Sequence, residues 1–284
     1  MTVITLKNAD LTVQIDSLGA QILSILDQTA TERIWTADPK IWGRHAPILF
    51  PIVGRLKDNQ YQYKNRVYQM NQHGFARDLE FQVLSHNARA VTFELKVAPH
   101  SIDNYPFSFS LQIAFVLKNN GLQVNYSVQN LDQQAMYFSV GGHPGFMFAY
   151  QQSGAQLVIK HPENLRQFAL NTANLVDLTT RQQPQAKIYF HGTSFEKDAW
   201  IFENRGLNSY ELWQNNCKKV SLTSNAPYFG VWSPYPQTAD FVCLEPWWGI
   251  ADVASTSGQL VDKFGINILQ PQQVFNAQWS VEFD

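Results

Sequence analysis

Two short segments, far apart in the chain, contain residue types that suit proton transfer. Residues 140–146 read VGGHPGF and place His143 between glycines and a proline, while residues 244–248 read LEPWW and place Glu245 beside an apolar run. A titratable residue between a strand-like run and a Gly or Pro break is typical of strand ends that face a cleft. An imidazole can donate a proton and a carboxylate can accept one, so His143 and Glu245 together predict general acid/base catalysis.

Both residues also have a purely structural interpretation. His143 could be a core histidine that makes structural hydrogen bonds, and its local sequence does not separate the two roles. Glu245 could form a buried salt bridge with an arginine, because a buried carboxylate is costly unless it is paired, hydrogen-bonded or open to a cleft. The aromatic pair Trp247 and Trp248 beside Glu245 favours the functional interpretation.

Two further segments contain polar residues that could bind a ligand. Residues 71–78 read NQHGFARD and bring His73 and Arg77 close together in the sequence, and Arg55 follows a glycine that lets the chain turn sharply. The structural alternative for the first segment is a solvated turn in which Arg77 pairs with a neighbouring carboxylate and contributes little. Arg55 on its own would be classed as a surface charge.

Four of the eight tryptophans occur beside glycines or prolines and not in the middle of a strand-like run: Trp42, Trp232, Trp247 and Trp248. Flat aromatic surfaces pack well against the C–H faces of sugars, and large rings provide contact area at low entropic cost. Core packing remains the default for most tryptophans. Trp248 is our candidate among them for contact with a substrate.

A metal site is not expected. His73, His143 and Glu245 form a possible ligand set, but no H-x-H or H-x-x-x-H spacing presents two ligands on one element. Cys217 and Cys243 lie in different motifs without metal-ligand spacing, so we expect two buried thiols and neither a disulfide framework nor a zinc cluster.

The composition limits the partners of this chain. Lys and Arg total 21 against 23 Asp and Glu, a net charge of -2, and no basic run is present, which argues against nucleic acid as a partner. The N-terminal residues lack the pattern of a secretion signal, and no segment is long and apolar enough to span a bilayer. We therefore expect a cytoplasmic protein that does not interact with membranes.

Short runs that alternate apolar and polar residues occur throughout the chain and predict strands. Clear examples are residues 11–15, 90–97 and 122–128, each bounded by turn residues. Residues 17–26 fit either a helix or a strand bent at a glycine, and βαβ alternation is missing. The sequence therefore predicts an all-β fold, with residues 1–284 forming one large antiparallel β-sandwich or barrel domain.

Four ordered motifs together resemble the aldose 1-epimerase (galactose mutarotase-like) family, and within it a branch of bacterial mutarotase-like proteins found near lactose and galactose utilisation genes. The motifs are Gly54-Arg55, QHGFAR at 72–77, GGHPGF at 141–146 and EPW at 245–247. Their order spans most of the chain. The resemblance implies a single large antiparallel β-sandwich with the substrate cleft across one concave sheet.

In that family a Glu takes the proton from the anomeric hydroxyl while a His protonates the ring oxygen, so that the sugar ring opens and recloses on either face. The resemblance implies that Glu245 is the base and His143 the acid, an isomerase chemistry that needs no cofactor. It further implies substrate contacts from Arg55, His73 and Asp198, the last with flanking residues that differ from the free-galactose enzymes. An ionised Glu245 near His143 would favour the imidazolium form.

The identity of the sugar stays open at this point. The short chain and residues 72–77 are also similar to the hexose-6-phosphate 1-epimerases, and Arg77, Arg55 or Arg44 could bind either a phosphate or sugar hydroxyls. A non-catalytic sugar-binding or sensing protein is the alternative from a different class, because a shared fold does not guarantee activity. We expect a monomer or a homodimer.

Overall fold

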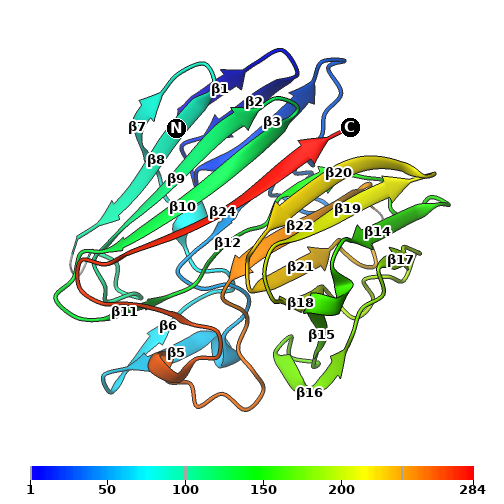
Figure 1. Cartoon of the computed structure of the whole chain (residues 1–284). Coiled ribbons are helices and arrows are strands. Elements are labelled where there is room, and N and C mark those ends of the chain that lie inside the picture. Colours follow the sequence, from blue (N-terminus) through cyan, green and yellow to red (C-terminus); the bar gives the residue numbers. More distant parts are fainter. Residues whose placement is uncertain (1, 99–100, 238) are drawn as a thin grey trace.

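In the computed structural model, which describes residues 2–98, 101–237 and 239–284, the chain is built almost entirely from antiparallel β-strands (Figure 1). Two large sheets form most of the molecule. The larger sheet has nine strands in the spatial order β17 (Lys187–Tyr189), β14 (Ala155–Ile159), β19 (Asn208–Gln214), β20 (Cys217–Ser224), β24 (Val274–Phe283), β10 (Gly121–Asn130), β9 (Phe109–Lys118), β8 (Ala90–Val97) and β7 (Gln82–His86). The smaller sheet runs through β16 (Val176–Gln182), β15 (Leu165–Leu170), β18 (Trp200–Asn204), β21 (Tyr228–Trp232), β22 (Phe241–Trp248), β12 (Val140–Gly142) and β4 (Ile48–Leu49), and β13 (Gly145–Met147) also pairs with β22.

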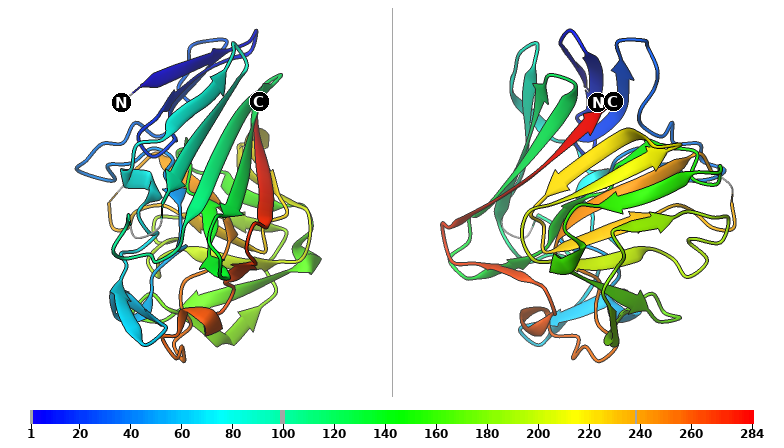
Figure 2. Two further views of the ribbon diagram at one scale, coloured as in Figure 1. Left: turned by 90° about the vertical axis from the view of Figure 1, so that its left-hand side faces the viewer. Right: turned by 45° about the vertical axis from the view of Figure 1, so that its right-hand side comes forward.

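Smaller elements complete the fold. A three-stranded sheet and two two-stranded ladders are formed by β1 (Val3–Lys7), β2 (Leu11–Asp16) and β3 (Gln21–Asp27), by β5 (Gln60–Tyr63) and β6 (Arg66–Gln69), and by β11 (Met136–Phe138) and β23 (Asn267–Leu269). Four short 3-10 helices are η1 (Lys57–Asn59), η2 (Ala76–Asp78), η3 (Pro162–Asn164) and η4 (Leu260–Asp262). The sheet β1–β3 lies at one end of the molecule and the hairpin β5–β6 at the other (Figure 2). In the described part of the chain, no helix is long and apolar enough to cross a membrane.

The period-two pattern of the sequence produces the layers of the sandwich. In β10 the side chains of Leu122, Val124, Tyr126 and Val128 are buried, while those between them are partly exposed. Successive side chains of a strand point to opposite faces of its sheet, so one face of β10 enters the core and the other faces solvent. The predicted strands at 11–15, 90–97 and 122–128 are confirmed as β2, β8 and β10.

Strand β22 differs because all eight of its residues are buried. Val242, Leu244 and Trp248 belong to the main core cluster, which also contains Tyr126 and Trp279 of the larger sheet. The rings of Trp248 and Tyr126 meet edge to face, with centroids 5.8 Å apart. The two sheets therefore pack face to face through one side of β22, and the predicted antiparallel β-sandwich is confirmed.

Two local expectations are settled by the structure. Residues 17–26 are not helical: Gly19 turns the chain with a φ of 72°, and β3 follows from Gln21, so the glycine-bent strand is the correct alternative. The expectation of two buried thiols is wrong for Cys217, which is exposed at the start of β20, and right for Cys243 in β22.

A buried ion pair supports the loops beside β22. Lys263 Nζ lies 3.3 Å from Asp252 Oδ1, and the two side chains are only 2% and 4% exposed. The other carboxylate oxygen of Asp252 accepts the backbone N–H of Lys57, while the backbone N–H of Asp252 donates to the carbonyl of Arg55. Asp252 and Lys263 thus tie together three loop segments, one of which carries Arg55.

Substituting Lys263 should therefore destabilise the protein far more than substituting an exposed partner of an ion pair. We expect Lys263→Met to lower the free energy of unfolding by about 3–5 kcal/mol, because it leaves the Asp252 carboxylate buried and uncompensated. The matched control is Lys218→Met, which removes a partly exposed pair with Asp284 and should cost less than about 1 kcal/mol. Urea unfolding checks both values, and equal small losses would contradict the structural role of Lys263.

Candidate active site

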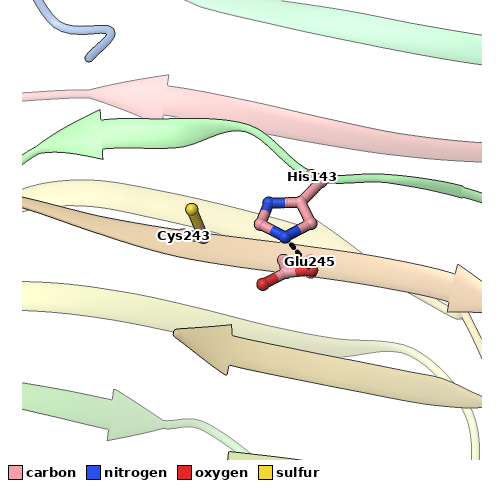
Figure 3. Close-up of side chains that lie close together, drawn as sticks. All are labelled: His143, Cys243 and Glu245. Atoms are coloured by element: carbon pink, nitrogen blue, oxygen red, sulfur yellow. Dashed lines mark ion pairs between the residues drawn. The ribbon is translucent and has the colours of Figure 1, made fainter. Parts of the chain in front are cut away.

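His143 and Glu245 lie opposite each other in the smaller sheet. Both β12 and β13 pair with β22, and the antiparallel register that joins Gly141 to Trp247 continues across the break between these two short strands. His143 occupies that break, directly across from Glu245, and its backbone N–H donates to the carbonyl of Pro47. The Nε2 atom of His143 lies 3.1 Å from Oε2 of Glu245 (Figure 3). The pairing that the two motifs predict is therefore present.

The His143–Glu245 pair lies at a cavity of about 330 Å³, a volume within the range of small-molecule sites. Six of the seven residues predicted for the site line this cavity: Arg55, His73, Arg77, His143, Asp198 and Glu245. The remaining lining residues are Trp42, Pro47, Gly54, Gln72, Leu170, Asn174, Ala199, Ile201, Trp232, Trp247 and Ala251. The fold thus brings loops and strand ends from the whole length of the chain to one place.

Trp248 does not line the cavity, and its predicted contact with a substrate is corrected by the structure. Side chains alternate along β22, so Glu245 and Trp247 share one face while Trp248 points to the core between the sheets. The indole of Trp247 passes across Gly230, where an added Cβ would come within 2.5 Å of the ring. Trp247 is therefore the tryptophan of this motif that contacts the site.

Aromatic rings also hold His143 in place. Trp42 packs against its imidazole with ring centroids 5.0 Å apart, and Trp232 meets it edge to face at 5.7 Å. Both tryptophans line the cavity, although their sequence context was noted without selecting them for the site. Trp42 and Trp232 also contact each other at 5.7 Å, so the imidazole packs against a pair of touching indoles.

His73 is a second imidazole with a defined tautomer. Its Nδ1 accepts the backbone N–H of Gly54 at 3.1 Å, so in the neutral ring the proton is on Nε2. Burial, with a smaller contribution from the charge of His143, holds the pKa of His73 well below its usual range. The rings of His73 and His143 meet edge to face at 5.5 Å. His73 can thus serve the cavity as a neutral hydrogen-bond donor.

Two guanidinium groups form another wall. Arg55 donates to the side-chain oxygen of Gln72 at 3.3 Å, and Arg77 donates to the carbonyl of the same residue at 2.8 Å. The Nε atoms of both arginines are buried without a hydrogen-bond partner among the described residues. The sequence also allowed Arg77 to be a solvated turn residue that pairs with Asp78. The two side chains do approach each other, but Nε of Arg77 lies 3.8 Å from Oδ2 of Asp78, so this ion pair explains only part of the arrangement.

Several buried polar atoms of the cavity residues lack partners in the described structure. They are Nδ1 of His143, Oε1 of Glu245 and Nε of Arg55 and Arg77, whereas Oε2 of Glu245 contacts His143. Buried polar atoms are normally hydrogen-bonded, and leaving one unpaired is costly. The set contains both donors and acceptors around an acid/base pair, which is the complement of a small molecule rich in hydroxyl groups.

Comparison with known proteins agrees with this geometry. The family model described as aldose 1-epimerase matches residues 2–266. The chain belongs to the aldose 1-epimerase family. Its curated relatives include the chromosomal protein LacX of Lactococcus lactis subsp. lactis, which is 29% identical over 92% of each chain.

Solved structures of the aldose 1-epimerase family share the whole fold. A galactose mutarotase related enzyme from Lactobacillus acidophilus is 38% identical, with a TM-score of 0.93 over 100% of this chain and 97% of that one. A galactose mutarotase-like protein from Lactobacillus casei is 27% identical, with a TM-score of 0.90 over 100% of both chains. The galactose mutarotase-like sandwich expected from the motifs is thereby confirmed.

Sequence reasoning did not identify every residue that this member of the family brings to the cavity. Asn174 lines it from a turn, and the backbone of Asn174 is left-handed with a φ of 57°. The asparagines at 171 and 174, which favour turns, were the available signal. Ile201 and Leu170 supply apolar wall from β18 and β15, and an aliphatic residue in a strand carries no local sign of such a role.

Cys243 lies close to the His143–Glu245 pair on the same face of β22 (Figure 3). Their potential metal-binding atoms are within 4.8 Å of one another. Burial and the charge of Glu245 raise the pKa of the Cys243 thiol well above its usual range, whereas a metal is bound by the thiolate. Nε2 of His143 is already directed at Glu245. The structure thus places a packed thiol next to the acid/base pair.

The protonation of the pair differs from the expectation of a stable ion pair. Burial lowers the pKa of His143 to about 3, and burial together with the charge of Asp198 raises the pKa of Glu245 well above its usual range. Desolvation disfavours both charges, so it opposes the imidazolium that an ionised Glu245 would promote. The two residues share one proton over a wide pH range, and they titrate as a unit.

The raised pKa of Glu245 predicts a stability change that depends on pH. From the unfolded value of 4.5 up to its folded pKa, the unfolded chain releases this proton while the native protein retains it, so rising pH removes native stability. Glu245→Gln abolishes this loss. We therefore expect Glu245→Gln to raise the melting temperature at pH 8 and to raise it less at pH 5.

Glu94→Gln is the matched control with the opposite sign. Hydrogen bonds from Ser110 and Gln112 lower the pKa of Glu94, so its ionised form stabilises the native protein above pH 4.5. Glu94→Gln should therefore lower the melting temperature by similar amounts at pH 8 and at pH 5, because both values lie above the unfolded pKa of 4.5. Thermal unfolding at both pH values measures the two effects, and a loss of stability in Glu245→Gln at pH 8 would contradict the buried, protonated carboxyl.

Proposed function

We propose that this protein interconverts the α and β anomers of a hexose by opening and reclosing the sugar ring. The observation that carries the proposal is the 3.1 Å contact between His143 and Glu245 at a cavity where several buried polar atoms are unpaired. A hexose supplies hydroxyl groups that can pair these atoms and a C–H face that can rest on the indoles. Family membership supports a sugar as the substrate.

The reaction needs two proton transfers at oxygens attached to one carbon. The Glu245 carboxylate removes the proton of the anomeric hydroxyl, and the imidazolium of His143 gives its proton to the ring oxygen as the bond from that oxygen to C1 breaks. The product is the open-chain aldehyde with neutral His143 and protonated Glu245. Rotation about the bond between C1 and C2 and the reverse transfers then close the ring on the other face of the carbonyl.

The buried pair suits this cycle because it holds one proton before ring opening, on His143, and one proton after it, on Glu245. The ion pair is the state before ring opening, and the neutral pair is the state after it. Desolvation, which lowers the pKa of His143 to about 3 and raises that of Glu245, favours the neutral state over the ion pair and so favours the two proton transfers of ring opening. Only protons move in this scheme, so we propose that it proceeds without a cofactor.

Other cavity residues bind and orient the sugar. The neutral His73 offers its Nε2–H beside His143, and Arg55 and Arg77 offer unpaired donors to hydroxyl groups. Asp198 can accept a hydrogen bond from a sugar hydroxyl, and Trp247 contributes an indole to the lining. Such positioning lowers the reaction barrier by more than the hydrogen bonds contribute to binding, because both proton-transfer groups must lie beside the same carbon.

Replacing either member of the pair should abolish turnover and spare binding. We expect His143→Gln and Glu245→Gln each to reduce anomer exchange by about 10²–10⁴-fold, with sugar affinity within about tenfold of wild type, because proton transfer is lost while the cavity remains. The matched control is His161→Gln, at an exposed histidine outside the cavity. Exchange of α- and β-glucose and galactose by NMR measures activity, and exchange at the wild-type rate in either variant would leave a sugar-binding protein as the better proposal.

A phosphorylated sugar is the second candidate substrate, because Arg77 and Arg55 have unpaired Nε atoms and Arg44 lies nearby in an ion pair with Asp78. On the leading proposal, Arg77→Gln lowers kcat/KM for glucose and for glucose 6-phosphate by similar factors, because it removes one hydroxyl contact. A loss confined to the phosphate, about tenfold or more, would instead assign Arg77 to a phosphate. Arg205→Gln, at an exposed arginine far from the cavity lining, is the control.

A further inference from the structure

A second hollow adjoins the cavity that holds the His143–Glu245 pair. This side cavity has a volume of about 470 Å³ and lies over β15, the start of β18 and the loop between β17 and β18. Its lining residues are Gln167, Phe168, Ala169, Leu170, Gln182, His191, Thr193, Ser194, Glu196, Lys197, Ala199 and Trp200. None of the residues predicted for the site belongs to it.

The two cavities are separated by a narrow rim. Leu170 and Ala199 line both of them, each with a partly exposed side chain. Along one continuous segment, Lys197 faces the side cavity and the next residue, Asp198, faces the main cavity. Because the side chains of Leu170 and Ala199 border both cavities, a molecule that crosses this rim would touch both of them.

The lining of the side cavity suits a second sugar ring. Trp200 provides aromatic surface, and Gln167 and Gln182 provide amide groups that can donate to and accept from hydroxyls. The indole of Trp200 is held in advance, because its Nε1 donates to a backbone carbonyl at 2.9 Å and its ring stacks on Phe190 at 5.4 Å. A rigid aromatic surface beside polar groups binds with little loss of side-chain entropy.

We propose that the side cavity binds the second ring of a reducing disaccharide whose reducing ring occupies the main cavity. The inference rests on the proposed function. The anomeric hydroxyl must be free at the His143–Glu245 pair, so the second ring can be attached only through another hydroxyl of the first. That attachment crosses the rim at Leu170 and Ala199, and it leaves the reacting carbon untouched.

The test fills the side cavity and compares a monosaccharide with disaccharides. Gln167→Trp and Thr193→Trp each place an indole in the side cavity, from β15 and from the loop between β17 and β18. Gln183→Trp is the matched control, since this exposed glutamine lines a different hollow and not the side cavity. NMR exchange kinetics give kcat/KM for glucose, for maltose and for cellobiose with each protein.

We expect both filled variants to lower kcat/KM for at least one disaccharide by about tenfold relative to glucose, which is the usual effect of losing one subsite contact. Gln183→Trp should leave this ratio unchanged, and retained glucose exchange shows that the variants are folded. An unchanged ratio in every filled variant that exchanges glucose would overturn the side cavity as a subsite while leaving the proposed function standing. Failure of the wild-type protein to exchange any of the three sugars would overturn the proposed function and the subsite together.

Discussion

Burial of the Glu245 carboxyl opposite His143 is the interaction on which the rest of the site depends. Glu245 is 1% exposed in a strand whose eight residues are all buried, and such a carboxyl is costly unless it keeps a proton or gains a partner. The adjacent imidazole provides that partner without bringing a permanent charge, because its own pKa is lowered by the same burial. One proton shared between two desolvated groups is therefore the least costly arrangement, and it is also the state that acid/base chemistry needs.

Strand β22 connects this interaction to the fold. One face of the strand contributes Val242, Leu244 and Trp248 to the core between the sheets, and the other presents Glu245 and Trp247 to the cavity. A shift of one residue in the register of β22 would exchange the two faces. It would place a carboxyl in the apolar core and remove the base from the cavity. The alternation of side chains along β22 thus determines both how the two sheets pack and where the base lies.

The sequence was sufficient to predict the strands and the residues with distinctive chemistry. Period-two runs identified β2, β8 and β10, and the His-Pro and Glu-Pro motifs identified the pair. What local sequence could not supply was burial in three dimensions. The choice of Trp248 missed a signal that was present, because Trp247, two residues after Glu245 in a strand, shares the face of Glu245. The protonation of the His143–Glu245 pair was out of reach for a related reason: charge neighbours can be inferred from motifs, but the degree of desolvation depends on distant layers.

Three polar residues at the cavity share a backbone feature that links the loops to the site. His73, Asn174 and Asp198 all adopt left-handed conformations, with φ values of 67°, 57° and 66°. This region disfavours most side chains but is tolerated by Asn, Asp and His, whose enrichment there is several-fold. Each loop turns sharply at the position where its polar side chain meets the cavity, on three separate segments of the chain. Glycine would fit these backbones with less strain, but it would supply no hydrogen-bonding group, so the polar residues at these turns are explained by the site and not by the fold.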